Sequence, residues 1–145
     1  MKGLSFNCRG LASLDKWLAL KRLCLSKKLD FVMLQETLGD GPLVLQTLKS
    51  FLPNWEFFFL DVRGRSGGLA LGFNISSAKI TNVWGGQGFL GEDITSISPH
   101  LTLRIFNIYG PCHHREVFWE SLLQSDFVQP ENIIIGGDLK TIVRQ

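Results

Sequence analysis

The chain has 145 residues, a formal net charge of +2, 45% hydrophobic residues and 19% charged residues. This length suits one domain with a sizeable core, and the composition excludes a disordered chain. The sequence contains no apolar run of membrane-spanning length, and its first residues lack the pattern of a signal peptide. We therefore expect a soluble intracellular protein without a membrane partner. A nuclear location is compatible with the sequence but is not indicated by it.

The charges are unevenly distributed along the chain. Residues 1–28 hold seven Lys or Arg residues and one acid, Asp15. Such a segment suits a phosphate-bearing partner, but it is also typical of the solvated face of a helix. The second interpretation is the more common one for a basic segment of this kind.

The cysteines do not form a disulfide or metal pattern. Cys8, Cys24 and Cys112 are odd in number and widely spaced, and no C-x-x-C pair occurs. This usage is typical of reduced thiols in an intracellular protein, so we expect no disulfide partner.

The first half of the chain alternates between predicted strands and helices. Residues 1–8 predict a strand that brings Asn7 to its end, and Ser13 is the expected cap of the helix that follows. An apolar run at residues 30–36 predicts a second strand. A helix is expected at residues 43–52, ended by Pro53 and Asn54.

The second half is richer in strands. An aromatic strand is expected at residues 55–62, and a basic glycine-containing loop at 63–68 connects it to the next strand in a hairpin. Turns are expected at Gly85-Gly86 and at Pro99. The remaining predicted elements are strands at 69–73, 79–84, 94–98, 101–109 and 132–138, and a helix at 116–124. This order favours an α/β sandwich of mixed or antiparallel sheets with outer helices over a purely parallel sheet.

Polar side chains follow several of these strands where each one ends. Ile133, Ile134 and Ile135 predict a strand covered on both faces, and two glycines then let the backbone turn so that Asp138 stands at the edge of the sheet. Glu36 likewise ends an apolar strand.

Together with Asn7, Glu36 and Asp138 suit a hard divalent cation such as Mg²⁺, which takes a few carboxylate oxygens, waters and substrate phosphate. The alternative is that both carboxylates are ordinary residues at strand ends.

Two further groups invite a chemical interpretation. Tyr109, beside a Gly-Pro turn, is suited to donate a hydrogen bond to a phosphate oxygen, although taken alone it is better explained by an amphipathic position at the edge of the core. Cys112, His113 and His114 are adjacent, so their side chains point apart and no second ligand pair has zinc-like spacing. We interpret them as a loop, and His100 as a turn residue.

Five motifs occur in one order along the whole chain. They are Ser-Phe-Asn-Cys-Arg-Gly-Leu (5–11), Leu-Gln-Glu-Thr (34–37), Arg-Ser-Gly-Gly-Leu-Ala-Leu (65–71), Asn-Ile-Tyr-Gly-Pro (107–111) and Ile-Ile-Gly-Gly-Asp-Leu (134–139). Together they resemble the endonuclease/exonuclease/phosphatase superfamily, which has the DNase-I-like fold. The resemblance is greatest to the endonuclease domain of plant LINE-type non-LTR retrotransposons.

The resemblance implies a four-layer α/β sandwich and cleavage of phosphodiesters with Mg²⁺ or Mn²⁺. Glu36 matches the principal metal ligand, and Asn7 the asparagine near the metal and the nucleophile. Tyr109 matches the tyrosine that contacts phosphate. Asp138 matches the aspartate that orients and activates the attacking water.

The chain departs from the family pattern in two places. Lys140 stands where the family has an asparagine, and we expect it to contact substrate phosphate as a flexible point charge. Family members also continue to a further aspartate and a Ser-Asp-His motif. The resemblance therefore implies that residues 1–145 are the N-terminal part of one such domain, with a fold that is incomplete at the C-terminus and an open strand edge.

Three functions remain open from the sequence. The first is a metal-dependent DNA endonuclease whose site contains Asn7, Glu36, Tyr109 and Asp138. The second, which the departures favour, is a non-catalytic retrotransposon-derived remnant that at most binds nucleic acid. The third is a phosphomonoesterase of the same fold, which the fold alone does not distinguish.

Overall fold

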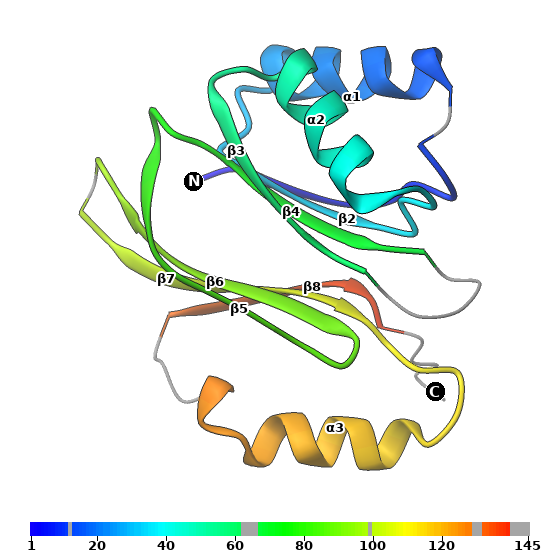
Figure 1. Ribbon diagram of the computed structural model, residues 1–145. Coiled ribbons are helices and arrows are strands. Elements are labelled where there is room, and N and C mark those ends of the chain that lie inside the picture. The colour runs from blue at the N-terminus through cyan, green and yellow to red at the C-terminus, as the bar shows by residue number, and fades with distance from the viewer. Residues whose placement is uncertain (12, 62–66, 99, 129–131, 140–145) are drawn as a thin grey trace, which may run out of the picture.

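The computed structural model describes residues 1–11, 13–61, 67–98, 100–128 and 132–139. Eight strands form two four-stranded sheets that face each other, and helices cover their outer faces (Figure 1). The layers are therefore helix, sheet, sheet and helix, which confirms the predicted four-layer α/β sandwich.

Sheet A has the strand order β1-β2-β4-β3. Its strands are β1 (Gly3–Asn7), β2 (Phe31–Gln35), β3 (Trp55–Leu60) and β4 (Leu69–Asn74). β1 and β2 run parallel, and β4 is antiparallel to both β2 and β3. The antiparallel pair β3 and β4 confirms the predicted hairpin.

Sheet B has the strand order β5-β6-β7-β8. Its strands are β5 (Ala78–Gly86), β6 (Phe89–Ser96), β7 (Thr102–Tyr109) and β8 (Ile133–Asp138). β5, β6 and β7 form an antiparallel meander, whereas β7 and β8 run parallel. Each sheet therefore contains one parallel pair, whose crossover includes a helix.

Two helices lie on sheet A. α1 (Leu14–Ser26) begins after Ser13, whose side chain accepts a hydrogen bond from the Lys16 amide at 3.4 Å, and it buries Trp17, Leu20 and Cys24 at helical spacing. α2 (Gly41–Phe51) has a proline in its first turn, where the missing N–H costs nothing.

On the far side, sheet B is covered by α3 (Arg115–Gln124) and a 3₁₀ turn, η1 (Asp126–Val128) (Figure 1). None of the helices in the described ranges combines the length and the apolar character that crossing a membrane requires.

The layers are held together by three apolar clusters. One fills the space between α1, α2 and sheet A, the second lies between the two sheets, and the third lies between sheet B and α3. In β8, for example, Ile134 packs into the cluster between the sheets while Ile133 packs toward α3. This alternation follows from the twofold side-chain period of a strand.

One predicted turn and one predicted strand boundary are wrong. Gly85 and Gly86 continue β5, opposite Leu90 and Phe89, so β6 begins at Phe89 rather than at residue 94. The turn uses Gly88 instead, which has a φ of +78° that favours glycine. The paired glycines serve packing, because a Cβ on Gly86 would collide with the ring of Phe89.

The last strand is also less buried than predicted. β8 is an edge strand that pairs with β7, and Ile135 is 39% exposed. Its three isoleucines therefore do not indicate coverage on both faces, because β-branched residues suit a half-covered edge as well.

Candidate active site

The polar residues singled out from the sequence lie at the carboxyl ends of the parallel strands. Asn7 ends β1, Tyr109 ends β7 and Asp138 ends β8, while Glu36 directly follows β2. Within the sheets, Asn7 is the register partner of Gln35, and Tyr109 is the partner of Asp138. Each sheet therefore contributes two neighbouring side chains.

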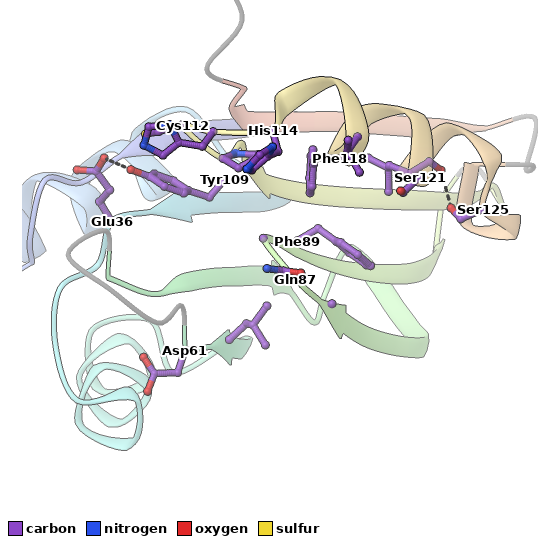
Figure 2. Close-up of a pocket in the computed structure, with 17 residues that line it drawn as sticks. Glu36, Asp61, Gln87, Phe89, Tyr109, Cys112, His114, Phe118, Ser121 and Ser125 are labelled. Atoms are coloured by element: carbon purple, nitrogen blue, oxygen red, sulfur yellow. Dashed lines mark hydrogen bonds between the residues drawn. The ribbon is translucent and has the colours of Figure 1, made fainter.

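Two hydrogen bonds connect these side chains from one sheet to the other. Asn7 Nδ2 donates to Asp138 Oδ2 at 3.2 Å. The Tyr109 hydroxyl donates to Glu36 Oε1 at 3.1 Å, and Figure 2 shows this second bond. The structure thus brings Asn7, Glu36, Tyr109 and Asp138 together into one group, which we call the candidate site.

The loop after β1 holds the amide of Asn7 in place. Asn7 Oδ1 accepts a hydrogen bond from the Arg9 amide at 3.0 Å, which leaves Nδ2 directed to Asp138. Lys16 Nζ donates to the backbone oxygens of Cys8, Arg9 and Gly10 at 2.8 to 3.2 Å. Lys16 therefore stabilises this loop, a role that the solvated-face interpretation of the basic segment did not include.

Glu36 sits in an uncommon backbone conformation. Its φ is +51°, in the left-handed region that non-glycine residues rarely adopt, and its carbonyl accepts a hydrogen bond from the Gly10 amide at 2.7 Å. Such strain persists where surrounding contacts determine the conformation, and it is concentrated at functional sites.

The two glycines before Asp138 have different tasks. Gly137 has a φ of +129°, and a Cβ there would lie 1.9 Å from the Ile108 backbone oxygen. A Cβ on Gly136 would instead lie 2.4 Å from Met33 Cε, in the space between the sheets. Gly137 thus permits the predicted change in backbone direction, while Gly136 permits sheets A and B to approach closely beside the site.

A groove leads away from the Glu36–Tyr109 pair. It has a volume of about 1100 Å³ and passes between α3 and the β5–β6 hairpin. Figure 2 shows Phe118 and Ser121 on α3 at one side and Gln87 and Phe89 on the hairpin at the other. No sequence pattern predicts this groove, because its walls come from elements that meet only in the folded chain.

The Cys112–His114 segment, predicted as a loop, lines the same groove beside Tyr109. His114 precedes α3 with a φ of +54°. All three residues of this loop are exposed.

Cysteine chemistry is suppressed next to the candidate site. Cys8 follows Asn7 directly and is 2% exposed, and burial raises the pKa of its thiol to about 12. Cys24 is likewise buried, with its pKa raised to about 11. Both thiols are therefore neutral near pH 7, and at that pH neither acts as a nucleophile or as a thiolate ligand.

The donor set at the candidate site suits a hard cation. Within the described residues, no three or more His, Cys, Asp and Glu side chains gather as potential metal ligands. Mg²⁺, however, requires only one or two carboxylates, because waters and substrate phosphate complete its coordination. Glu36 supplies one such carboxylate, and Asp138 and the amide of Asn7 belong to the same group of side chains. Lys140, the predicted phosphate contact, lies outside the described residues.

Solved structures share this architecture. An endonuclease/exonuclease/phosphatase family protein from Bacteroides thetaiotaomicron superposes with a TM-score of 0.69 at 13% identity, over 94% of this chain and 62% of that one. TDP2 from D. rerio, solved with a single-strand DNA product, superposes with a TM-score of 0.70 at 21% identity, over 96% of this chain and 60% of that one. The chain has the DNase-I-like fold.

DNase-I-like proteins with different substrates are among these neighbours. The mannosyl-6-phosphatase Bt3783 of B. thetaiotaomicron VPI-5482 superposes with a TM-score of 0.69 at 13% identity, over 94% of this chain and 64% of that one. The present chain therefore spans 60 to 64% of the length of these three proteins. No protein-family model and no curated protein matches the sequence. At these identities, the similarity establishes the fold alone.

Proposed function

We propose that this chain carries the site of a metal-dependent phosphodiester hydrolase that acts on DNA. The observation that supports the proposal is the convergence of Asn7, Glu36, Tyr109 and Asp138 through two hydrogen bonds that join the sheets. An amide, a phenol and two carboxylates provide a proton acceptor, hydrogen-bond donors and oxygen ligands within one group. Those are the chemical groups that hydrolysis of a phosphate ester requires.

Asp138 and Asn7 have the role of preparing water in this proposal. Asp138 accepts a proton from the water that attacks phosphorus, in line with the leaving oxygen. Asn7 orients this carboxylate through its 3.2 Å hydrogen bond to Oδ2. Tyr109 donates its one hydroxyl proton to Glu36 in the free chain. When substrate binds, that donor would turn to a non-bridging phosphate oxygen, where negative charge increases in the transition state.

Glu36, with the side-chain amide oxygen of Asn7, would hold Mg²⁺ or Mn²⁺. When bound, such an ion polarises a phosphoryl oxygen and lowers the pKa of a coordinated water. Glu36 is suited to this role because its strained backbone and the hydrogen bond from Tyr109 fix its direction.

DNA is the substrate that the sequence motifs favour, because they resemble those of plant LINE-type endonucleases. The groove gives separate support, since it extends from the Glu36–Tyr109 pair along α3 and leaves space for a substrate that continues beyond the phosphate. A phosphomonoesterase of the same fold remains the alternative. It would bind a phosphate with only one substituent, for which a groove of this length is not required.

The proposal is tested by nicking of supercoiled plasmid in the presence of Mg²⁺ or Mn²⁺. We expect the wild-type chain to nick the plasmid and Glu36→Ala to lose at least about 100-fold in rate. Glu120→Ala, at an exposed position on α3, is the matched control and should retain the wild-type rate. Hydrolysis of small phosphomonoesters, measured in parallel, separates the two hydrolase alternatives.

A non-catalytic protein would give a different result in the same assay. Folded wild-type chain would bind DNA with an affinity that falls steeply with salt and would not cleave it. Metal-dependent cleavage that Glu36→Ala abolishes is incompatible with that alternative. Absence of cleavage by folded protein would refute the hydrolase.

A further inference from the structure

We propose that Gln35 and Asn107 are positioning residues that set the distance between the two halves of the candidate site. The proposal rests on the proposed function, because it assigns these residues a role in that site's geometry. Neither residue is placed in contact with substrate. We call Gln35 and Asn107 the amide pair.

The amide pair connects the two sheets beneath the candidate site. Gln35 ends β2 in sheet A and Asn107 lies in β7 of sheet B, and they are 1% and 0% exposed. Gln35 Nε2 donates to Asn107 Oδ1 at 2.8 Å. This side-chain bond crosses the layer between the sheets, which is otherwise filled mainly by apolar residues.

Asn107 also binds the backbone of sheet A directly. Its Nδ2 donates to the Leu34 oxygen at 2.9 Å and to the Ala70 oxygen at 2.8 Å. Leu34 and Ala70 form the last register pair between β2 and β4. One side chain of sheet B therefore contacts two neighbouring strands of sheet A at the point where their pairing ends.

The amide pair is adjacent to the residues that it would position. Gln35 directly precedes Glu36, and Asn107 lies two residues before Tyr109 on the same face of β7. Tyr109 in turn donates to Glu36. The strands that lead to Glu36 and Tyr109, β2 and β7, are thus joined twice: once at the site and once in the buried layer below it.

A role in stability alone does not account for amides at these positions. Ile105, on the same face of β7, is buried among apolar residues, so this layer accepts apolar side chains. An apolar pair would gain packing and lose the hydrogen bonds from Asn107 to the Leu34 and Ala70 oxygens. Buried amides bonded across the two sheets, in contrast, favour one register, because a slide of the sheets leaves buried donors unpaired. The amide pair therefore fixes the relative position of Glu36 and Tyr109.

The test uses the double variant Gln35→Met/Asn107→Leu, which removes both amides and keeps similar volumes. Two quantities are measured besides the unfolding midpoint. The first is kcat and KM for plasmid nicking. The second is the ring resonance of carbon-13-labelled Tyr109, which is a single signal because the chain contains one tyrosine. The matched control is Ser96→Ala, a buried polar position at the opposite end of β6.

We expect kcat to fall about 10- to 100-fold with little change in KM, because small displacements of catalytic groups affect the chemical step most. The Tyr109 resonance should move toward its position in Glu36→Gln, where the partner carboxylate is absent. Ser96→Ala should change neither quantity. If the double variant does not fold, Gln35→Met alone provides both readouts, since it leaves the two bonds from Asn107 to sheet A in place.

A folded variant with wild-type kcat and an unmoved Tyr109 resonance would overturn the proposal. Equal changes in Ser96→Ala would overturn it as well, because they would indicate general loosening of the fold. The resonance does not depend on turnover. If the wild-type chain does not cleave DNA, the proposed function fails, while the resonance still decides whether the amide pair positions Tyr109.

Discussion

The Asn7 side-chain amide donates a hydrogen bond to Asp138 Oδ2 at 3.2 Å, joining residues that are 131 positions apart in the chain. One belongs to the first strand of sheet A and the other to the last strand of sheet B. In the proposed mechanism, this bond orients the Asp138 carboxylate toward the attacking water. That relationship gives the first prediction.

Asn7→Ala should lower kcat for DNA nicking about 10- to 100-fold, because Asp138 loses the donor that orients it. The fold should be retained, since Asn7 is only partly buried. Asn54→Ala is the control, because Asn54 also uses its amide to join two segments through bonds to Asn74 and Ser76, on another part of the surface. Equal activity of wild type and Asn7→Ala would contradict the assigned role.

The second prediction concerns the two glycines of β8. Gly137→Ala should reduce the free energy of unfolding by on the order of 3 kcal/mol, because the new Cβ meets the Ile108 backbone in a conformation that favours glycine. Gly136→Ala should cost only about 1 kcal/mol, because the end of the Met33 side chain can move. Urea unfolding midpoints measure both losses of stability. A larger loss in Gly136→Ala than in Gly137→Ala would refute this explanation.

The third prediction is a loss of stability with rising pH caused by Glu92. Glu92 is 0% exposed, and neither of its carboxyl oxygens has a hydrogen-bond partner among the described residues. Burial, with a further contribution from Glu56, raises its pKa from 4.5 to about 8. Between these values the unfolded chain releases a proton that the folded chain retains. Stability should therefore fall as pH rises from 4.5 to about 8, by up to about 1.4 kcal/mol per pH unit.

Glu92→Gln should remove this slope and leave the variant more stable than wild type at pH 8. Thermal unfolding across the pH range measures both effects. Glu56→Gln provides the companion variant, which should keep most of the slope because burial is the larger cause of the raised pKa. An unchanged slope in Glu92→Gln would show that other groups cause the pH dependence.

The fourth prediction concerns Lys16. Lys16→Met removes three hydrogen bonds to the backbone oxygens of Cys8, Arg9 and Gly10, so the loop that follows Asn7 should open more often. Faster hydrogen exchange of the Gly10 and Leu11 amides is the direct measurement, since these bond to the loop after β2. Arg22→Met, at an exposed position on the same helix, should leave their exchange rates unchanged.

Much of this arrangement could be predicted from the sequence because it depends on local patterns. Apolar runs that end in polar residues located Asn7, Glu36, Tyr109 and Asp138 at the ends of strands, and the motif order indicated the sandwich. The proximity of the four side chains is confirmed by the structure. Their roles in catalysis, the metal and the DNA substrate stay predictions.

Features that depend on contacts between distant segments could not be predicted in this way. The amides of Gln35 and Asn107 look like ordinary polar residues near strand ends until both sheets are in place. Gly85 and Gly86 suggested a turn, but their lack of a Cβ makes room for Leu60 and Phe89 instead. Similarly, three isoleucines indicate a strand without revealing whether it lies at the centre or the edge of a sheet.

The division of the site between two sheets has a consequence for its response to motion. Asn7 and Glu36 move with one packed layer, and Tyr109 and Asp138 move with the other. Fluctuations within either sheet leave the spacing of its own pair nearly unchanged, whereas sliding of one whole sheet over the other changes both hydrogen bonds together. The chemistry of such a site would respond to shear between rigid layers, and mutations far from it would affect activity to the extent that they permit this sliding.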